Sequence, residues 1–172
     1  MSRFLIINAA LFQISWWVAA LYSQYAAVII FVIIALHFWL TPTPKEDGVL
    51  LIIALLGVLS DTLQIMLGVF STLEDTMTWW LISLWGSFTL CLNHSLRWLN
   101  SMAYWQIAIL GGLFGPLSYI AAIKLGALST TLSISEVVAI QLPCWAVLLV
   151  AMVWLNQHSQ QLYRMVAEVN HE

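Results

Sequence analysis

Six long apolar segments dominate the sequence and limit what it can fold into. They fall at about residues 4–22, 25–41, 48–70, 77–97, 102–123 and 133–156. Each is close to the roughly 20 apolar residues that an α-helix needs to cross the hydrocarbon core of a bilayer. The shorter alternating segments of a membrane β-barrel are absent from the sequence. The pattern therefore predicts an all-α, polytopic membrane protein with six transmembrane helices.

Composition agrees with a lipid environment and argues against nucleic acid as a partner. Of the 172 residues, 62% are hydrophobic and 8% are charged, whereas about 25% are charged in typical soluble domains. The net charge is −3 with five basic residues, so the clustered Lys and Arg that bind nucleic acid are lacking. Cys91 and Cys144 lie inside apolar segments without CxxC spacing. We interpret both as packing residues.

The basic residues predict the orientation of the chain. In a six-helix arrangement Lys124 falls on one side, and the other four basic residues fall on the side of both termini: Arg3, Lys45, Arg97 and Arg164. Cytoplasmic loops carry an excess of Lys and Arg, so we expect both termini in the cytoplasm. We expect one transmembrane domain over residues 1–156 and a polar cytoplasmic tail over residues 157–172.

The stretch GVLSDTLQIMLG, residues 57–68, places a carboxyl group among apolar residues. A rise of about 1.5 Å per residue puts Asp61 roughly 20 Å into its helix, near the bilayer centre. A carboxyl group is costly there and marks a functional position by default. Gly57 and Gly68 share its helix face, and small residues let a neighbouring helix approach. We expect Asp61 to point into the bundle, either to bind a ligand or to hydrogen-bond helices together.

Polar and small residues at similar depth on other segments predict an interior cleft. The stretch GGLFGPLSY contains the small pair Gly111 and Gly115 and the helix-interrupting Pro116. An indole at residue 85 is deep enough to line a pocket. The residues that we expect to bind a ligand at this depth are Gln13, Asp61, Gln64, Trp85, Ser118 and Tyr119.

A second group of polar residues lies at the predicted cytoplasmic end. It comprises the stretch LNHSLRWLN, residues 92–100, together with Asn8 and His37 at comparable depth on the first two segments. We interpret His37 and His94 as interfacial rather than as metal ligands, because ligand histidines are usually supported by nearby carboxylates. The sequence therefore predicts no metal site, and it leaves any cofactor unidentified. Arg97 is most simply a topology anchor. The candidate binding residues of this group are Asn8, Asn93, His94 and Arg97.

Four motifs resemble one known family: NAALFQISWW, LGVLSDTLQIMLG, LISLWGSFTLCLNHSLRWL and GPLSY followed by KLGAL. The chain resembles the uncharacterised small bacterial inner-membrane proteins known as domain of unknown function number twenty-eight seventy-eight. The resemblance covers the first five segments and implies a location in the bacterial inner membrane. Members of this family occur beside genes resembling cyclopropane-type fatty acyl synthases, flavin-dependent amine oxidases and short-chain dehydrogenases. This implies a role in membrane-lipid modification, with a lipid-modifying enzyme as candidate partner.

Three functions remain open from the sequence. The first, which we expect, is an accessory protein that binds a membrane lipid or similar amphipathic molecule in the cleft. The second is a membrane enzyme that uses Asp61 or His94 as acid or base, although neither a GxSxG nor an HExxH motif is present. The third is a small proton-coupled transporter, for which a single mid-membrane aspartate is a poor relay. The sequence does not identify the ligand or the oligomeric state.

Overall fold

The computed structural model describes residues 2–73 and 77–169, with side chains over residues 4–73 and 77–161. Part of the predicted loop at 71–77, the end of the predicted tail, and the Arg3 and Arg164 side chains lie outside the described residues. The described chain is helical, and the predicted all-α class is confirmed. Its elements are α1 (Ser2–Leu21), α2 (Ser23–Leu40), α3 (Pro44–Met66), α4 (Trp79–Thr89), the 3₁₀ helix η1 (Arg97–Ser101), α5 (Tyr104–Lys124) and α6 (Ile134–Val169).

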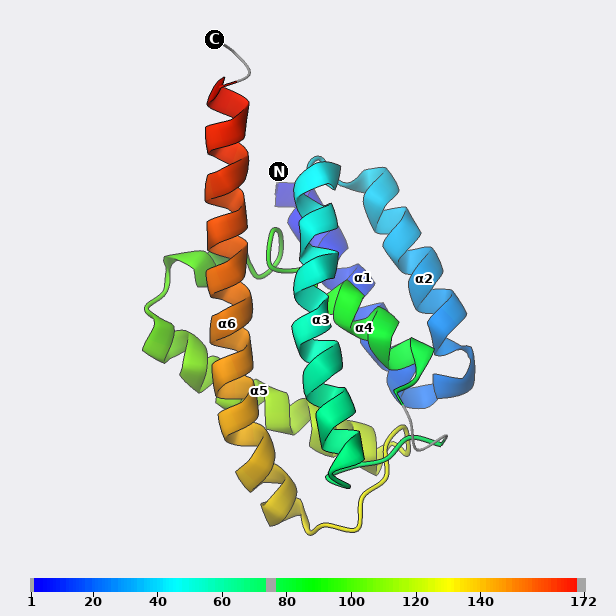
Figure 1. Ribbon diagram of the computed structural model, residues 1–172. Helices are drawn as coiled ribbons and strands as arrows, with labels where there is room; N and C mark the ends of the chain where they lie inside the picture. The colour runs from blue at the N-terminus through cyan, green and yellow to red at the C-terminus, as the bar shows by residue number, and fades with distance from the viewer. Residues whose placement is uncertain (1, 74–76, 170–172) are drawn as a thin grey trace.

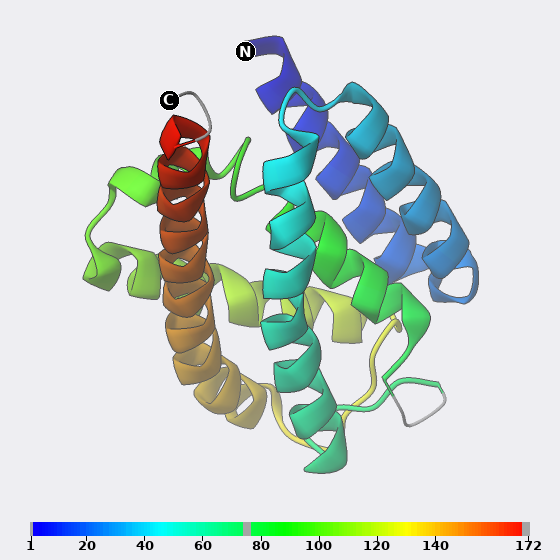
Figure 2. The same ribbon diagram turned by 45° about the horizontal axis from the view of Figure 1, so that its top comes forward.

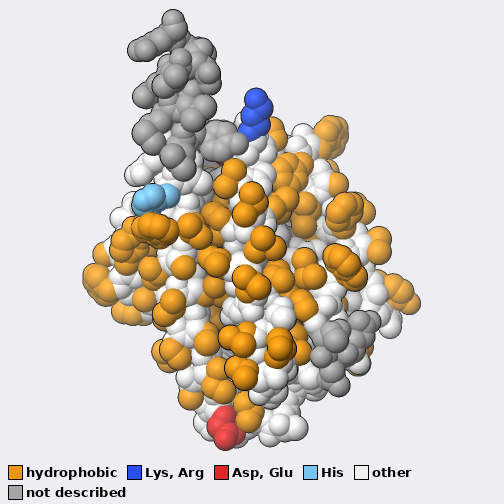
Figure 3. All heavy atoms as spheres, viewed as in Figure 1, with side chains coloured by type: hydrophobic (Ala, Val, Ile, Leu, Met, Phe, Trp, Pro, Cys, Tyr) orange, Lys and Arg blue, Asp and Glu red, His pale blue; other side chains and the backbone are white. Residues whose placement is uncertain are grey.

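The outer surface of the molecule is apolar. Within the described residues, five helices are long and apolar enough to cross a membrane: α1, α2, α3, α5 and α6. Hydrophobic side chains cover the face shown in Figure 3, with basic atoms at one end and acidic atoms at the opposite end. Exposed apolar surface this extensive marks contact with lipid or with another apolar partner. The fold is that of a helical membrane protein.

The helices form two groups. In Figures 1 and 2, α1, α2 and α3 run up and down in succession, and α5 crosses behind α3 and α6. The start of α1 and the end of α6 lie at the same end of the molecule. Helix α4 packs against α1, α2 and α3, whereas α5 packs mainly against α6, and α6 contacts α3. In the part of the chain that the structure describes, α1 and α5 are not among the helix pairs that pack together.

The fourth apolar segment is less helical than the sequence predicts. Helix α4 has 11 residues and ends at Thr89 instead of near residue 97. At about 1.5 Å per residue it is roughly 16 Å long, about half of the hydrocarbon thickness of roughly 30 Å. Turns and η1 complete the segment over residues 90–101. The expectation of a full transmembrane helix at 77–97 is therefore wrong.

Buried amides of two other helices bind the non-helical backbone after α4. Asn8 of α1 donates to the Leu90 carbonyl at 3.4 Å and accepts the Ser95 backbone N–H at 3.1 Å. Asn156 of α6 donates to the Leu92 carbonyl at 3.4 Å. Irregular backbone at membrane depth is tolerated only where protein groups or a water-filled cavity satisfy it. The break in α4 therefore depends on side chains far away in the sequence.

Helix α3 begins earlier and α6 ends later than the sequence predicts. Pro44 stands at the first position of α3, where the missing N–H of proline has no intrahelical partner to lose. Asp47 consequently lies in the first turn of the helix, with a fully buried side chain, and the assignment of residues 41–48 to a loop is wrong from Pro44 onward. Helix α6 continues to Val169, so the described part of the predicted tail belongs to the same helix.

The connections at the end opposite the termini are joined by a short backbone pairing. The N–H of each of Ser71 and Ser129 donates to the carbonyl of the other, at 2.8 and 2.9 Å, and their hydroxyls are 2.8 Å apart. Thr130 also donates its hydroxyl to the Val69 carbonyl at 2.7 Å. The connection after α3 is thereby fixed to the connection between α5 and α6.

We predict that Asn8→Ala lowers the free energy of unfolding by about 1–3 kcal/mol, because it leaves the partly buried Ser95 N–H without its acceptor. The measurement is reversible unfolding in mixed micelles of a mild detergent and dodecyl sulfate. The control is Gln13→Ala on the same helix, whose exposed side chain has no hydrogen-bond partner among the described residues. Equal stability of the two variants would contradict the role given to Asn8.

Candidate functional site

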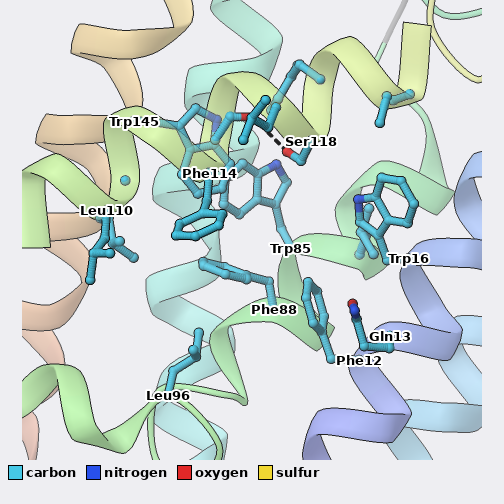
Figure 4. Close-up of a pocket in the computed structure, with 18 of the residues that line it drawn as sticks. Phe12, Gln13, Trp16, Trp85, Phe88, Leu96, Leu110, Phe114, Ser118 and Trp145 are labelled. Atoms are coloured by element: carbon cyan, nitrogen blue, oxygen red, sulfur yellow. Dashed lines mark hydrogen bonds between the residues drawn. The ribbon is translucent and has the colours of Figure 1, made fainter. Parts of the chain in front are cut away.

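A hollow with aromatic walls lies where α1 and α5 do not pack together. Its volume is about 600 Å³, and its lining comes from α1, α4, η1, α5 and α6. Figure 4 shows aromatic rings from several helices facing this space, together with the polar side chains of Gln13 and Ser118. We call this space the aromatic hollow. Its aromatic lining residues are Phe12, Trp16, Trp17, Trp80, Trp85, Phe88, Trp98, Phe114, Tyr119 and Trp145.

Stacked rings form one continuous wall of the aromatic hollow. The indoles of Trp85 and Trp145 stack with centroids 5.2 Å apart and an angle of 23° between their planes. Phe88 meets both indoles edge-on, each at 5.7 Å, and Phe12 of α1 lies 5.6 Å from Phe88. Offset and edge-to-face pairs are favourable beyond the area that they bury. The wall thus extends from α1 through α4 to α6.

Glycines make room for the two stacked indoles. A Cβ atom at Gly57 would overlap the Trp85 indole, and one at Gly115 would overlap the Trp145 indole. A Cβ atom at Gly111 would lie 2.5 Å from the Trp145 carbonyl oxygen. The small residues of α3 and α5 therefore accommodate tryptophans of neighbouring helices, and they set the position of the wall.

Asp61 accepts hydrogen bonds from two residues that line the aromatic hollow. Its side chain has no exposed surface. The Trp85 indole N–H donates to Asp61 Oδ2 at 2.7 Å, and the Tyr119 hydroxyl donates to Asp61 Oδ1 at 2.5 Å. The carboxyl group points into the bundle and joins α3, α4 and α5. It does not line the aromatic hollow, and it affects that space through Trp85 and Tyr119.

Four of the residues predicted at this depth line the aromatic hollow, whereas Asp61 and Gln64 do not. Gln13, Trp85, Ser118 and Tyr119 line the aromatic hollow. Gln13 is exposed there, and the Ser118 hydroxyl donates to the Gly115 carbonyl at 2.8 Å (Figure 4). Gln64 is buried outside the lining; its amide donates to the Ser60 hydroxyl at 3.3 Å and its oxygen has no partner.

A compact polar cluster lies between the end of α2, the start of α3 and the segment after α4. Its centre is the carboxylate of Asp47. His37 Nε2 lies 3.0 Å from Asp47 Oδ2, and His94 Nε2 lies 2.9 Å from the same oxygen. All three side chains are buried. We call these residues the His–Asp–His cluster.

Neutral side chains complete the bonding of Asp47. The Thr41 hydroxyl donates to Oδ2 at 2.6 Å, and the Asn93 amide donates to Oδ1 at 2.9 Å. Gln160 of α6 in turn donates to Asn93 Oδ1 at 2.7 Å. These contacts fix the carboxylate from α2, α3, α6 and the segment after α4.

Of the four binding residues predicted at the cytoplasmic end, three lie in or beside the His–Asp–His cluster and one is exposed. Asn93 and His94 bond to Asp47, and the Asn8 amide nitrogen lies 3.5 Å from His37 Nδ1. Arg97 is exposed in η1. Sequence reasoning missed Asp47. Pro44 was the available signal, because proline is common at the first position of a helix and places Asp47 in the first helical turn. A supporting carboxylate is therefore present beside the histidines.

The fold and site define a helical integral membrane protein with a lateral aromatic hollow and a separate buried polar cluster. The family described as "Protein of unknown function (DUF2878)" matches residues 5–151. The chain belongs to this family, as the sequence motifs indicate. The match continues into α6, beyond the five segments in which the motifs lie. No curated protein and no solved structure matches the chain significantly.

We predict that Asp61→Asn destabilises the protein by about 1–3 kcal/mol. An amide offers one side-chain oxygen where the carboxyl group offers two, so either Trp85 or Tyr119 loses the acceptor of a buried donor. The measurement is unfolding in mixed micelles, with near-ultraviolet circular dichroism to follow the packing of the indoles. The control is Glu136→Gln at the exposed start of α6, where the amide oxygen can still accept the Ser133 backbone N–H, so the near-ultraviolet signal of the indoles should not change. An unchanged Asp61→Asn protein would contradict the bridging role of Asp61.

Proposed function

We propose that the protein binds the apolar part of a membrane lipid or similar amphipathic molecule in the aromatic hollow, as an accessory factor in membrane-lipid modification. The observation that carries this proposal is an apolar space of about 600 Å³ at the depth of the membrane. Binding sites for small molecules typically measure about 300–1,000 Å³, with apolar walls and few polar groups. The aromatic hollow has this size and this chemistry.

The mouth of the aromatic hollow favours entry from the bilayer. Trp17, Phe114 and Leu117 belong to its lining and are 51%, 61% and 52% exposed. Apolar side chains with this exposure on a membrane protein contact acyl chains, so a lipid chain reaches the space without crossing a polar barrier. Gln13 is exposed in the same lining and offers an amide to a polar group of the guest.

The chemistry of the lining favours holding a molecule over transforming it. Tyr119 is the one ionisable residue in the described lining, and its hydroxyl is engaged with Asp61. Both oxygens of Asp61 already accept hydrogen bonds from protein groups. Asp61 lies outside the lining and the Tyr119 hydroxyl donates its proton to Asp61, so neither group is placed as a general base toward a guest in the aromatic hollow. This supports an accessory protein over an enzyme that uses Asp61.

We also propose that the chain crosses a bacterial inner membrane six times, with both termini in the cytoplasm. The fourth crossing would combine α4 with the buried segment after it, because backbone satisfied by neighbouring helices is tolerated at membrane depth. The adjacent ends of α1 and α6 support an even number of crossings. The excess of basic residues on that side supports the cytoplasmic assignment.

We predict that Ser118→Phe reduces the lipid that co-purifies with the protein by roughly tenfold. The added ring fills part of the aromatic hollow, and a loss of about 1.4 kcal/mol in binding free energy lowers the affinity tenfold. The measurement is mass spectrometry of lipids extracted from protein purified in a mild detergent.

The matched control is Leu113→Phe, which adds a similar ring to α5 at an exposed position outside the lining. It should retain lipid as the wild type does. Equal retention by Ser118→Phe, or no selectively retained lipid in the wild type, would overturn the binding proposal.

We predict that a fluorescent protein fused after residue 172 is fluorescent, because it folds in the cytoplasm. Alkaline phosphatase inserted after Thr131, an exposed residue between α5 and α6, should be active because it folds outside the cytoplasm. Paired activity assays of the two reporters at both sites make the measurement. The reverse result at either site would contradict the six-crossing topology.

A further inference from the structure

We propose that His37, Asp47 and His94 bind a first-row divalent cation of the zinc type. This site lies outside the lining of the aromatic hollow, and it goes beyond the proposed lipid binding. The sequence alone predicts no metal site, because the supporting carboxylate was assigned to a loop. The fold brings that carboxylate between two histidines that lie 10 and 47 residues away in the chain.

The geometry of the cluster fits a cation with little movement. One ligand atom from each of the three residues lies within 4.8 Å of the other two. Zinc binds histidine nitrogen and carboxylate oxygen at about 2.0–2.2 Å, so two ligands at right angles are about 2.9 Å apart and two at the tetrahedral angle about 3.4 Å apart. The two nitrogen–oxygen distances are 3.0 and 2.9 Å. They match neighbouring ligands of one ion.

The surroundings suit a cation with exchangeable ligands. The three side chains are 2%, 0% and 7% exposed, and the Phe4 ring lies 5.4 and 4.7 Å from the two imidazoles. Two imidazoles and one carboxylate favour zinc, iron, cobalt or manganese over calcium, which prefers oxygen ligands. Three protein ligands leave at least one coordination position for water or a substrate.

Groups around the ligands orient the carboxylate and distinguish the two histidines. Thr41 and Asn93 donate to the Asp47 oxygens, and hydrogen bonds of this kind commonly orient a carboxylate that binds a metal. Asn8 Oδ1 is occupied by Ser95, so the amide N–H group faces His37 Nδ1 and cannot accept its proton. A cation on His37 Nε2 places the imidazole proton on Nδ1, so binding requires the Asn8 amide to move away from this nitrogen.

The test uses full-length protein purified without a metal-affinity tag, loaded with Co²⁺ or Zn²⁺ and freed of excess ion. We expect one ion per chain by elemental analysis and visible ligand-field bands with Co²⁺. Asp47→Asn and His94→Gln should lose both signals. The control His158→Gln removes an exposed histidine of α6 and should retain them.

Thermal stability of the wild type gives a second measurement, because substitutions at Asp47 also remove its hydrogen bonds. A cation that binds only the native state stabilises it by RT ln(1 + [L]/Kd), so Tm rises as the concentration of the free cation rises. We expect Zn²⁺ to raise Tm and a chelator to reverse the rise. Absence of both the Co²⁺ bands and the Zn²⁺-dependent rise in folded wild type would overturn the proposal and leave a hydrogen-bonded cluster only. Ser118→Phe should bind Co²⁺ normally, which separates this result from the test of lipid binding.

Discussion

The hydrogen bonds of Asp61 are the interaction on which the aromatic hollow depends. One carboxyl group accepts from Trp85 of α4 and from Tyr119 of α5. In hydrocarbon each unpaired polar group costs several kcal/mol, so donors and acceptor hold one another in place without competition from water. Gly57 leaves the space that the Trp85 indole occupies. These bonds join α3, α4 and α5, and residues of α1, α4, α5 and α6 line the aromatic hollow beside them.

The same constraint shapes the opposite end of the bundle. Asp47 is fully buried, and five side chains surround its two oxygens within 3.3 Å: His37, Thr41, Thr43, Asn93 and His94. Asn8 satisfies backbone groups of the segment that follows α4. Asn8, Asp47 and Asp61 are therefore buried where described helices meet, and many of the exposed side chains on these helices are apolar. The aromatic hollow and the His–Asp–His cluster have no lining residue in common and are thereby kept apart within one small fold.

Sequence reasoning could predict features that depend on local spacing. The inward direction of Asp61 followed from Gly57 on the same helix face, and the all-helical class followed from the apolar segments. The end of α4 could not be predicted, because the non-helical path of residues 90–101 depends on Asn8 and Asn156 of distant helices. Asp47 was missed for a related reason: a polar stretch that begins with proline resembles a loop, and only the packed fold shows that it is buried.

A side-chain-resolution cryo-electron microscopy map of the protein in lipid nanodiscs tests the central claim most directly. The account predicts elongated density between α1 and α5, against the Trp85 and Trp145 rings, with Asp61 still bonded to its two donors. A map in which α5 packs directly on α1, with no space beside the stacked indoles, would contradict it.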